Sequence, residues 1–151
     1  MTATKSFSLF LCSALCLLLA ACGPVEDTRP GQPVAHRQQA FKDILLSFEP
    51  MGIQLREQHY EAESFLKYAQ ELEQKEASPW AFFGPETDYP PSKSTPAVWE
   101  KPDAFAAERG GFETAVHQLL AAAESRELTQ IQPAYQAVQE HCRSCHKAFR
   151  K

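Results

Sequence analysis

The feature that most constrains the fold of this chain is its C-terminal sequence HCRSCHKAFRK, which contains Cys142, Cys145 and His146. Their Cys-x-x-Cys-His spacing is the attachment signature of c-type haem: two thiols bind the cofactor and the imidazole ligates its iron. Only five residues follow His146. The chain that encloses the cofactor must therefore come before the motif.

The segment 128–149 has the hydrophobic period of an amphipathic helix. Its apolar positions recur three and four residues apart: Leu128, Ile131, Tyr135, Val138, Cys142, Cys145 and Phe149. Residues at this spacing share one helix face. Both thiols and the His146 imidazole should therefore lie on the face that turns toward the core, and we expect the haem to lie inside the fold.

Three earlier segments show the same period: one that begins at Val34, one over 60–77 and one over 103–125. Pro50 interrupts the first, and a proline inside a helix removes a backbone hydrogen bond and crowds the preceding turn. We therefore expect a kink or short break over 49–52. The stretch 78–102 holds six prolines and many aromatic residues, which predicts a long loop packed on the fold.

No strand pattern competes with these helices. Four amphipathic helices with short outer connections and one long middle loop predict an all-α fold, an antiparallel up-down-up-down four-helix bundle over 34–151. The haem should be held inside it, near the C-terminal helix.

The first 21 residues are typical of a secretory signal, with Lys5 followed by an almost continuous apolar run over 7–21. The junction Leu-Ala-Ala-Cys at 19–22 resembles a bacterial lipobox, which implies a lipid on Cys22. The alternative is ordinary cleavage and an unanchored periplasmic protein. Residues 22–33, with three prolines and two glycines, predict a flexible tether.

The remaining composition narrows the partners and the cysteine chemistry. Of five cysteines, two leave with the signal, Cys22 takes lipid, and Cys142 and Cys145 remain for haem, so a disulfide scaffold is not expected. Basic residues number 15 against 19 acidic ones. Such a negative chain does not suit nucleic acid, which requires a basic face.

Two other interpretations of the Cys-x-x-Cys spacing remain open. A redox dithiol usually begins a helix in a strand-helix-strand setting, and no such strand is evident here. A zinc site needs four Cys or His ligands; His141 is a candidate third or fourth, while the other histidines are too scattered.

Three stretches together resemble the cytochrome c′ family, the class II c-type cytochromes. They are Cys-x-x-Cys-His-Lys-x-Phe-Arg at 142–150, WAFFGP at 80–85 and HRQ at 36–38. The resemblance implies one covalent haem c with its iron, a periplasmic haem protein that binds NO or transfers electrons, and a homodimer through the first two helices. The acidic residues between Glu57 and Glu76 would oppose such a dimer.

The resemblance also implies that the residue four after Arg37 faces the iron opposite His146. Low-spin members place methionine there, whereas five-coordinate members place an apolar residue. Here the position is Phe41, which cannot ligate iron. Met51 lies ten residues further, about 15 Å along a helix, and His36 is expected near the surface. We therefore expect five-coordinate iron that binds small diatomic gases such as NO and CO, with a low-spin periplasmic electron carrier as the alternative.

The resemblance assigns two arginines to the haem surroundings: Arg37 to a propionate, and Arg150 to the proximal side beside His146. His117 and His141 are given no functional role. Because Phe41 offers no distal acid or base, we expect no enzymatic chemistry. The expected location is the periplasm, anchored through Cys22 to a membrane, with Gly23 slightly favouring the outer one.

Overall fold

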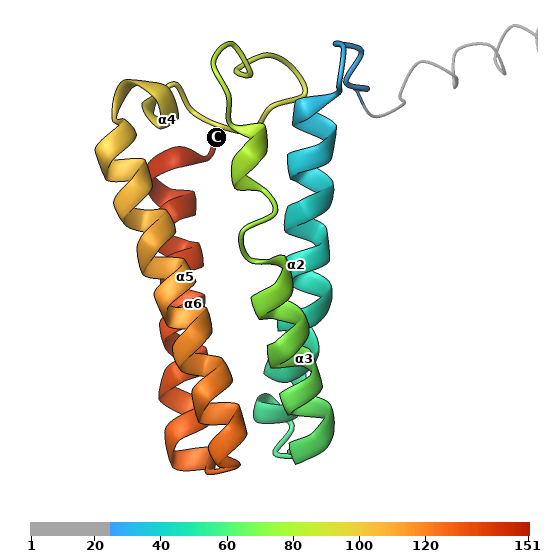
Figure 1. Cartoon of the computed structure of the whole chain (residues 1–151), viewed down its shortest axis with the longest axis vertical. Coiled ribbons are helices and arrows are strands. Elements are labelled where there is room, and N and C mark those ends of the chain that lie inside the picture. Colours follow the sequence, from blue (N-terminus) through green and yellow to red (C-terminus); the bar gives the residue numbers. More distant parts are fainter. Residues whose placement is uncertain (1–24) are drawn as a thin grey trace, which may run out of the picture.

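Four long helices run side by side along the length of the molecule in the computed structural model, which describes residues 25–151 (Figure 1). They are α2 (Pro33–Arg56), α3 (Ala62–Lys75), α5 (Pro102–Ser125) and α6 (Leu128–Phe149). Short connections join α2 to α3 and α5 to α6, and one long connection joins α3 to α5. The predicted all-α, up-down-up-down bundle is confirmed. The predicted signal peptide and Cys22 lie outside the described residues.

The helices differ in length, and this difference shapes the interior. Helix α3 has 14 residues, whereas α2 and α5 have 24 each, so α3 spans only about 21 Å against about 36 Å for its neighbours. The short helix η2 (Trp80–Phe82) and the loop around it continue beyond the end of α3 (Figure 1). One half of the bundle therefore has four helices around it, and the other has three helices and a loop.

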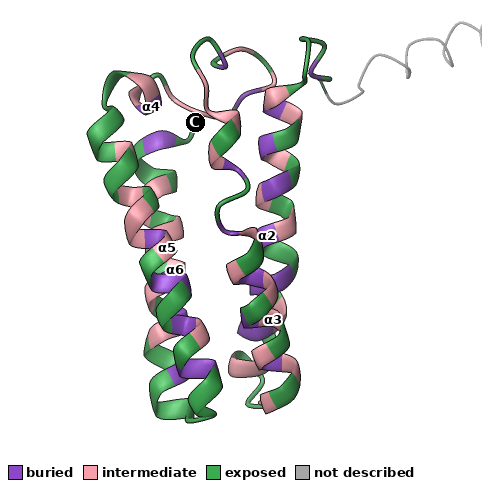
Figure 2. Ribbon diagram, in the orientation of Figure 1, coloured by how far each residue is buried: buried purple, intermediate pink, exposed green. Residues whose placement is uncertain are grey.

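The hydrophobic core fills the half that contains α3, where buried residues recur along the neighbouring helices (Figure 2). Helix α5 packs on α6 and on α3, and α2 packs on α3, while α2 and α6 approach one another less closely. Large side chains fill the wider space between α2 and α6. The rings of Phe48 and Tyr135 stack across it, with centroids 4.4 Å apart. Phe65, Leu72 and Leu119 are fully buried at the centre.

The break expected at Pro50 is absent, and this prediction was wrong. Helix α2 continues through Pro50 to Arg56. The missing hydrogen bond affects the carbonyl of Leu46, whose residue is 68% exposed and therefore open to water. The next turn is held by packing, since Met51 is fully buried and Gly52 lies directly against the hydroxyl of Tyr135.

The connection from α3 to α5 packs on the fold, as the sequence predicts. It contains η2 and the four-residue helix α4 (Ala97–Glu100), neither of which the hydrophobic period indicates. Trp99 donates from its indole Nε1 to the carbonyl oxygens of Phe83 and Gly84, at 3.3 and 3.0 Å. These bonds fold the loop back on itself and hold it across the end of the bundle.

The segment before α2 is attached to the bundle and does not form a tether over its whole predicted length. Asp27 is 2% exposed, and its Oδ2 accepts hydrogen bonds from the backbone N–H groups of Val34 and Ala35, at 2.9 and 3.1 Å. The hydroxyl of Tyr89 donates to Oδ1 of Asp27 at 3.0 Å. The tether predicted over 22–33 is therefore too long at its C-terminal end, because Asp27 satisfies free N–H groups in the first turn of α2.

The glycine pair in α5 has two different environments. A Cβ atom at Gly111 would lie 2.5 Å from the His141 ring, whereas one at Gly110 would meet nothing within 4 Å. Close contact with α6 therefore explains Gly111 alone.

Among the residues described, no helix combines the length and the apolar character that crossing a bilayer requires.

Candidate functional site

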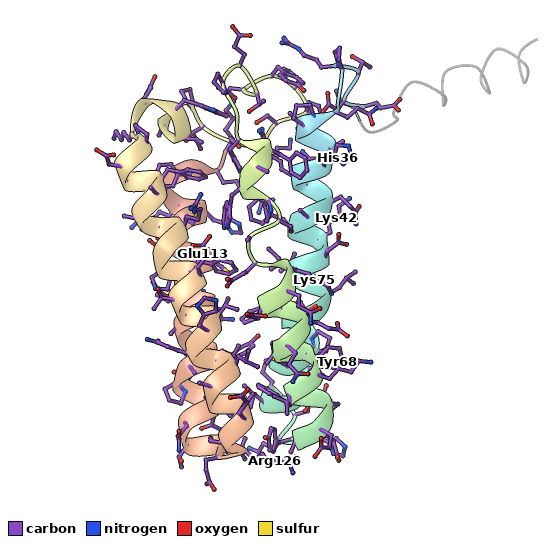
Figure 3. All side chains as sticks on the ribbon, viewed as in Figure 1. His36, Lys42, Tyr68, Lys75, Glu113 and Arg126 are labelled. Carbon is purple, nitrogen blue, oxygen red and sulfur yellow. The ribbon has the colours of Figure 1, made fainter. Side chains whose placement is uncertain are left out.

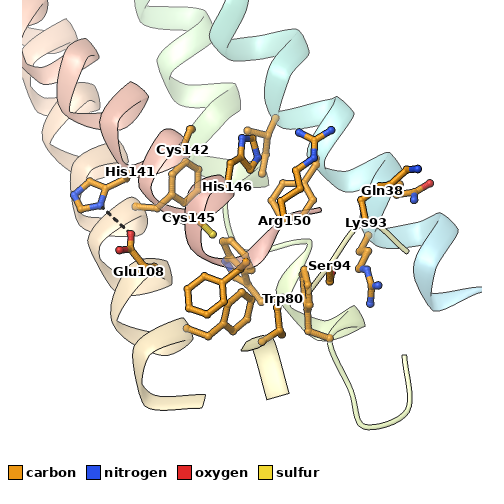
Figure 4. Close-up of a pocket in the computed structure, with 18 of the residues that line it drawn as sticks. Gln38, Trp80, Lys93, Ser94, Glu108, His141, Cys142, Cys145, His146 and Arg150 are labelled. Atoms are coloured by element: carbon orange, nitrogen blue, oxygen red, sulfur yellow. Dashed lines mark ion pairs between the residues drawn. The ribbon is translucent and has the colours of Figure 1, made fainter. Parts of the chain in front are cut away.

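A cavity of about 440 Å³ opens in the half of the bundle that α3 does not reach. Its wall comes from α2, the middle loop, α5 and α6, and it is mainly apolar (Figure 4). The residues that line it are Arg37, Gln38, Phe41, Lys42, Ile44, Leu45, Trp80, Phe83, Lys93, Ser94, Val98, Phe105, Glu108, Phe112, His141, Cys142, Cys145, His146, Phe149 and Arg150. This volume is in the usual range for cofactor sites.

The structure brings the three residues of the C-terminal motif to this cavity. Cys142, Cys145 and His146 all lie on α6 and line the wall, as their spacing predicts (Figure 4). Burial raises the pKa of each thiol to about 11, so both thiols are protonated at neutral pH. Burial, assisted by the charge of Arg150, lowers the pKa of His146. Its imidazole is therefore neutral at pH 7, the form that ligates a metal.

Phe41 lies on the α2 side of the cavity, within an aromatic cluster. Its ring meets Trp80 and Phe83 edge-on, with centroid distances of 5.6 and 6.2 Å. Trp80 also packs on Phe105 and Phe112 of α5. Among the described residues, Nε1 of Trp80 has no acceptor within hydrogen-bonding distance, and it is buried. These rings give one wall of the cavity an apolar surface.

Met51 and His36, which the sequence excludes as iron ligands, lie where the sequence predicts. Met51 is fully buried in the core and does not line the cavity. His36 stacks on Phe82, with ring centroids 5.3 Å apart, and is exposed at the outside of α2. Neither side chain therefore offers a donor atom to the cavity.

Arg37 lines the cavity but is held by the middle loop. Its Nη1 donates to Oγ1 of Thr87 at 3.0 Å and to the carbonyl of Phe82 at 3.2 Å. Its Nη2 donates to the carbonyl of Thr87 at 2.9 Å and to Oγ of Ser92 at 2.6 Å. The guanidinium also lies over the Phe83 ring, 4.7 Å from its centroid. These partners occupy both terminal nitrogens, so the predicted propionate contact is left with Nε alone.

Arg150 lies at the mouth of the cavity with two exposed lysines, Lys42 and Lys93. Its backbone pairs with Ser94 in an isolated bridge, and the N–H of Lys151 donates to the carbonyl of Lys93 at 2.7 Å. Among the described residues, Lys42, Lys93 and Arg150 form no ion pair within 4.0 Å. The sequence identified Arg150 but gave no signal for the two lysines.

Sequence reasoning also missed an acidic residue in the wall. Glu108 of α5 accepts a hydrogen bond from Oγ of Ser144 at 2.6 Å, and its Oε2 lies 3.9 Å from Nδ1 of His141 (Figure 4). His141 packs on Gly111, which brings α5 and α6 together here. The Gly110-Gly111 pair was the only signal for this contact in the sequence.

The comparison with known families decides the identity of this site. The sequence profile described as Cytochrome C' matches residues 32–150. The chain belongs to the cytochrome c′ family.

Individual relatives agree with this assignment. The cytochrome c′ of Alcaligenes xylosoxydans is 29% identical over 127 residues, which cover 83% of this chain and 98% of that protein. A carbon-monoxide-bound variant of Alcaligenes xylosoxidans cytochrome c′ superimposes with a TM-score of 0.76, at 29% identity, over 83% of this chain and 99% of that one. Another solved structure of a variant from that organism is a nitric oxide complex. The cytochrome c′ of Shewanella frigidimarina, at 23% identity and a TM-score of 0.78 over 82% of this chain and 98% of that one, shows the fold.

Haem c, covalently attached and carrying iron, is the cofactor of the cytochrome c′ family, and the prediction of a haem protein is confirmed. The site fits this group. Two thiols and a neutral imidazole face one apolar cavity, and basic side chains at its mouth match the charge of two propionates. Within residues 25–151, no group of three His, Cys, Asp or Glu side chains is arranged for a metal ion, so the zinc alternative has no ligand set there.

Proposed function

We propose that this protein is a gas-binding cytochrome c′ whose iron has five ligands and an open side toward Phe41. Cys142 and Cys145 would hold the haem covalently, and His146 would be its axial ligand. Haem supplies an iron to which small diatomic molecules bind. The observation that carries the proposal is the position of Phe41, which lines the same cavity as His146 but comes from the opposite helix, α2.

The residues around the open side favour uncharged diatomic ligands. The rings of Phe41 and Phe83 have no polar atom, so they give anions no hydrogen bond in exchange for their hydration. Bound O₂ develops negative charge and requires a donor, which Phe41 lacks, whereas NO and CO depend less on one. The relatives solved with CO and with NO support this choice of ligands. Among the described residues, the rings that pack on Phe41 belong to Trp80 and Phe83, which carry no acid or base. We therefore propose that the protein binds gas without catalysing a reaction.

Absorption and resonance Raman spectra of the ferrous protein, with and without CO, test this proposal. We expect five-coordinate iron that becomes six-coordinate when CO is added. Phe41→Met should give low-spin, six-coordinate iron without CO, because it places a thioether on that side. Phe41→Leu is the matched control and should stay five-coordinate. A low-spin native spectrum with no response to CO would contradict gas binding and favour the electron carrier.

For location, we propose a periplasmic protein anchored in a bacterial membrane through lipid on Cys22, with the outer membrane favoured by Gly23. The support is the apolar run followed by Leu-Ala-Ala-Cys. Mass spectrometry of the protein from its membrane fraction should show an acylated Cys22 as the first residue. An unmodified N-terminus would contradict the anchor.

For assembly, we propose a homodimer through α2 and α3. The support is an apolar strip on α2 where Leu46 is 68% exposed and Ile53 is 44% exposed. Sedimentation should show a dimer that Leu46→Lys converts to monomers, with the exposed Gln136→Lys on α6 as the control. A native monomer at high concentration would contradict this arrangement.

A further inference from the structure

The segment just before α2 is fixed at one end of the bundle, and this end is the one that contains the cavity. From this we infer that the cavity end faces the bilayer that carries the lipid anchor, held there by a leash of five residues. The inference rests on the proposed lipid at Cys22 and goes beyond it, because an anchor alone does not determine which end of a protein faces the membrane.

The first step is the attachment of Asp27. Its carboxylate accepts hydrogen bonds from the N–H groups of Arg29, Val34 and Ala35, and from the Tyr89 hydroxyl. Burial opposes ionisation, but these bonds outweigh it, and the pKa of Asp27 lies below its ordinary value. The carboxylate is therefore charged at neutral pH, and the attachment is intact there.

Two further contacts reinforce this attachment. The carbonyl of Asp27 accepts a bond from Nε2 of Gln32 at 3.0 Å. The guanidinium of Arg29 lies over the Tyr89 ring, 4.2 Å from its centroid. Asp27 through Gln32 therefore belong to the folded body.

The second step connects this attachment to the cavity. Tyr89 belongs to the loop that Arg37 holds through Thr87 and Ser92. The same loop supplies Lys93 and Ser94 to the cavity wall. Asp27 and the cavity are therefore joined through one hydrogen-bonded loop, at the end of the bundle where α2 begins.

The third step is the length of the leash. Cys22 precedes Asp27 by five residues, and a fully extended chain of that length spans at most about 18 Å. Phe41 lies seven residues beyond Val34, about 10 Å along α2. Even a taut leash therefore places the cavity within roughly 30 Å of the lipid headgroups. The turn after Arg56 lies about 36 Å from the start of α2 and points away.

The charges at this end must be separated from the leash as a cause of orientation. Lys42, Lys93 and Arg150 are exposed, and among the described residues they form no ion pair, so they would attract anionic lipid. Zwitterionic vesicles carry no net charge and remove this attraction. The orientation should persist in zwitterionic vesicles, because it depends on the leash.

A matched pair of fluorescent labels on the full lipidated holoprotein tests the orientation. Ala104 is exposed in the first turn of α5, at the cavity end, and Gln130 is exposed in the first turn of α6, at the opposite end. Each is replaced by Cys, labelled with one dye, and bound to phosphatidylcholine vesicles with and without a headgroup-attached quencher. We expect the Ala104→Cys label to lose a several-fold larger fraction of its fluorescence. Equal quenching, or stronger quenching of the Gln130→Cys label, would overturn the inference.

A leash variant isolates the cause. Insertion of about twelve Gly and Ser residues between Val25 and Glu26 lets the bundle turn freely, so the two labels should be quenched nearly equally. A control of native length, with residues 23–26 replaced by Gly and Ser, should keep the native difference. If the longer leash leaves the difference unchanged, the orientation does not come from the leash.

The anchor is established separately, before the labels are compared. Mass spectrometry and flotation with vesicles show whether Cys22 is acylated and the protein bound. A protein that is not acylated contradicts the proposed anchor. A protein that is acylated and bound, but has equal label quenching, contradicts only the orientation.

Discussion

The two halves of this bundle are built from the same long helices but serve different purposes. In the half that α3 covers, Phe65, Leu72 and Leu119 are fully buried in the hydrophobic core. In the other half, the middle loop replaces α3, and the wall encloses about 440 Å³. The truncation of one helix therefore separates a packed half that stabilises the fold from an open half that accommodates a cofactor.

The side chains follow the same division. The packed half combines aliphatic residues with the stacked pair Phe48 and Tyr135 and the edge-on pair Tyr60 and Phe65. The open half uses rings that meet mostly edge-on, such as Phe41 with Trp80 and Phe105 with Phe149. Rings in a wall are stiff and large, so they preserve a cavity that flexible aliphatic chains would tend to fill.

The largest expected effect contrasts one phenylalanine from each half. Phe65→Ala should lower the free energy of unfolding by about 3–5 kcal/mol, because the ring is fully buried. Phe41→Ala should cost about 1 kcal/mol, since one side of the ring already faces the cavity. Chemical denaturation of the holoproteins measures both. Equal losses of stability would contradict the proposed difference in packing between the two halves.

The second test removes the bonds that hold the loop over the open half. Arg37→Gln should lower stability by about 2–4 kcal/mol, because four acceptors lose a charged donor. Limited proteolysis should then cut the loop between Phe83 and Pro96. Arg37→Lys, which restores the charge without the planar fork, should recover only part of the loss. A loop equally resistant in all three proteins would contradict this role.

The third test uses two glycines. Gly52→Ala in the packed half should cost about 1–3 kcal/mol, because the new Cβ would overlap the Tyr135 hydroxyl. Gly110→Ala is the matched control, since its Cβ would meet nothing within 4 Å. It should instead stabilise the protein by up to about 1 kcal/mol through helix propensity. Thermal unfolding distinguishes these opposite signs.

The smallest effect concerns Glu76, which is 7% exposed and lies at the boundary between the halves. Burial raises its pKa above 4.5, although His117 at 3.0 Å opposes this shift. A raised pKa means that the folded state binds this proton more tightly than the unfolded state does. The stability that the protonated Glu76 contributes is therefore complete below pH 4.5, and it is lost as the pH rises through the pKa of the folded protein.

Glu76→Gln removes this titration. Between pH 4.5 and pH 7, the free energy of unfolding of the variant should therefore fall less than that of the native chain. Denaturation curves at the two pH values measure this difference. The exposed Glu124→Gln is the control and should leave the pH dependence unchanged. A native pH dependence in Glu76→Gln would contradict the role of this carboxyl.

The helices and the haem motif could be predicted from the sequence because they depend on local spacing. The positions of Cys142 and His146 on one face follow from the helical period alone. The prediction of a break at Pro50 was wrong, because the packing of Met51 and Gly52 outweighs the tendency of proline to end a helix. The placing of Glu108, Lys93 and Asp27 depends on which distant segments meet. Polar residues in loops and on outer faces have no period that reveals such contacts.

The attachment of Asp27 and Lys151 to adjacent loop residues has a consequence for the order of the helices. Asp27 accepts a bond from Tyr89, and Lys151 is paired with Asp88. A short linker should therefore join Lys151 to Asp27, with new termini opened at the exposed turn 57–59. In such a circular permutant α2 would come last, and Cys142-x-x-Cys145-His146 would lie in the interior of the chain. The cavity would be built from the same neighbours.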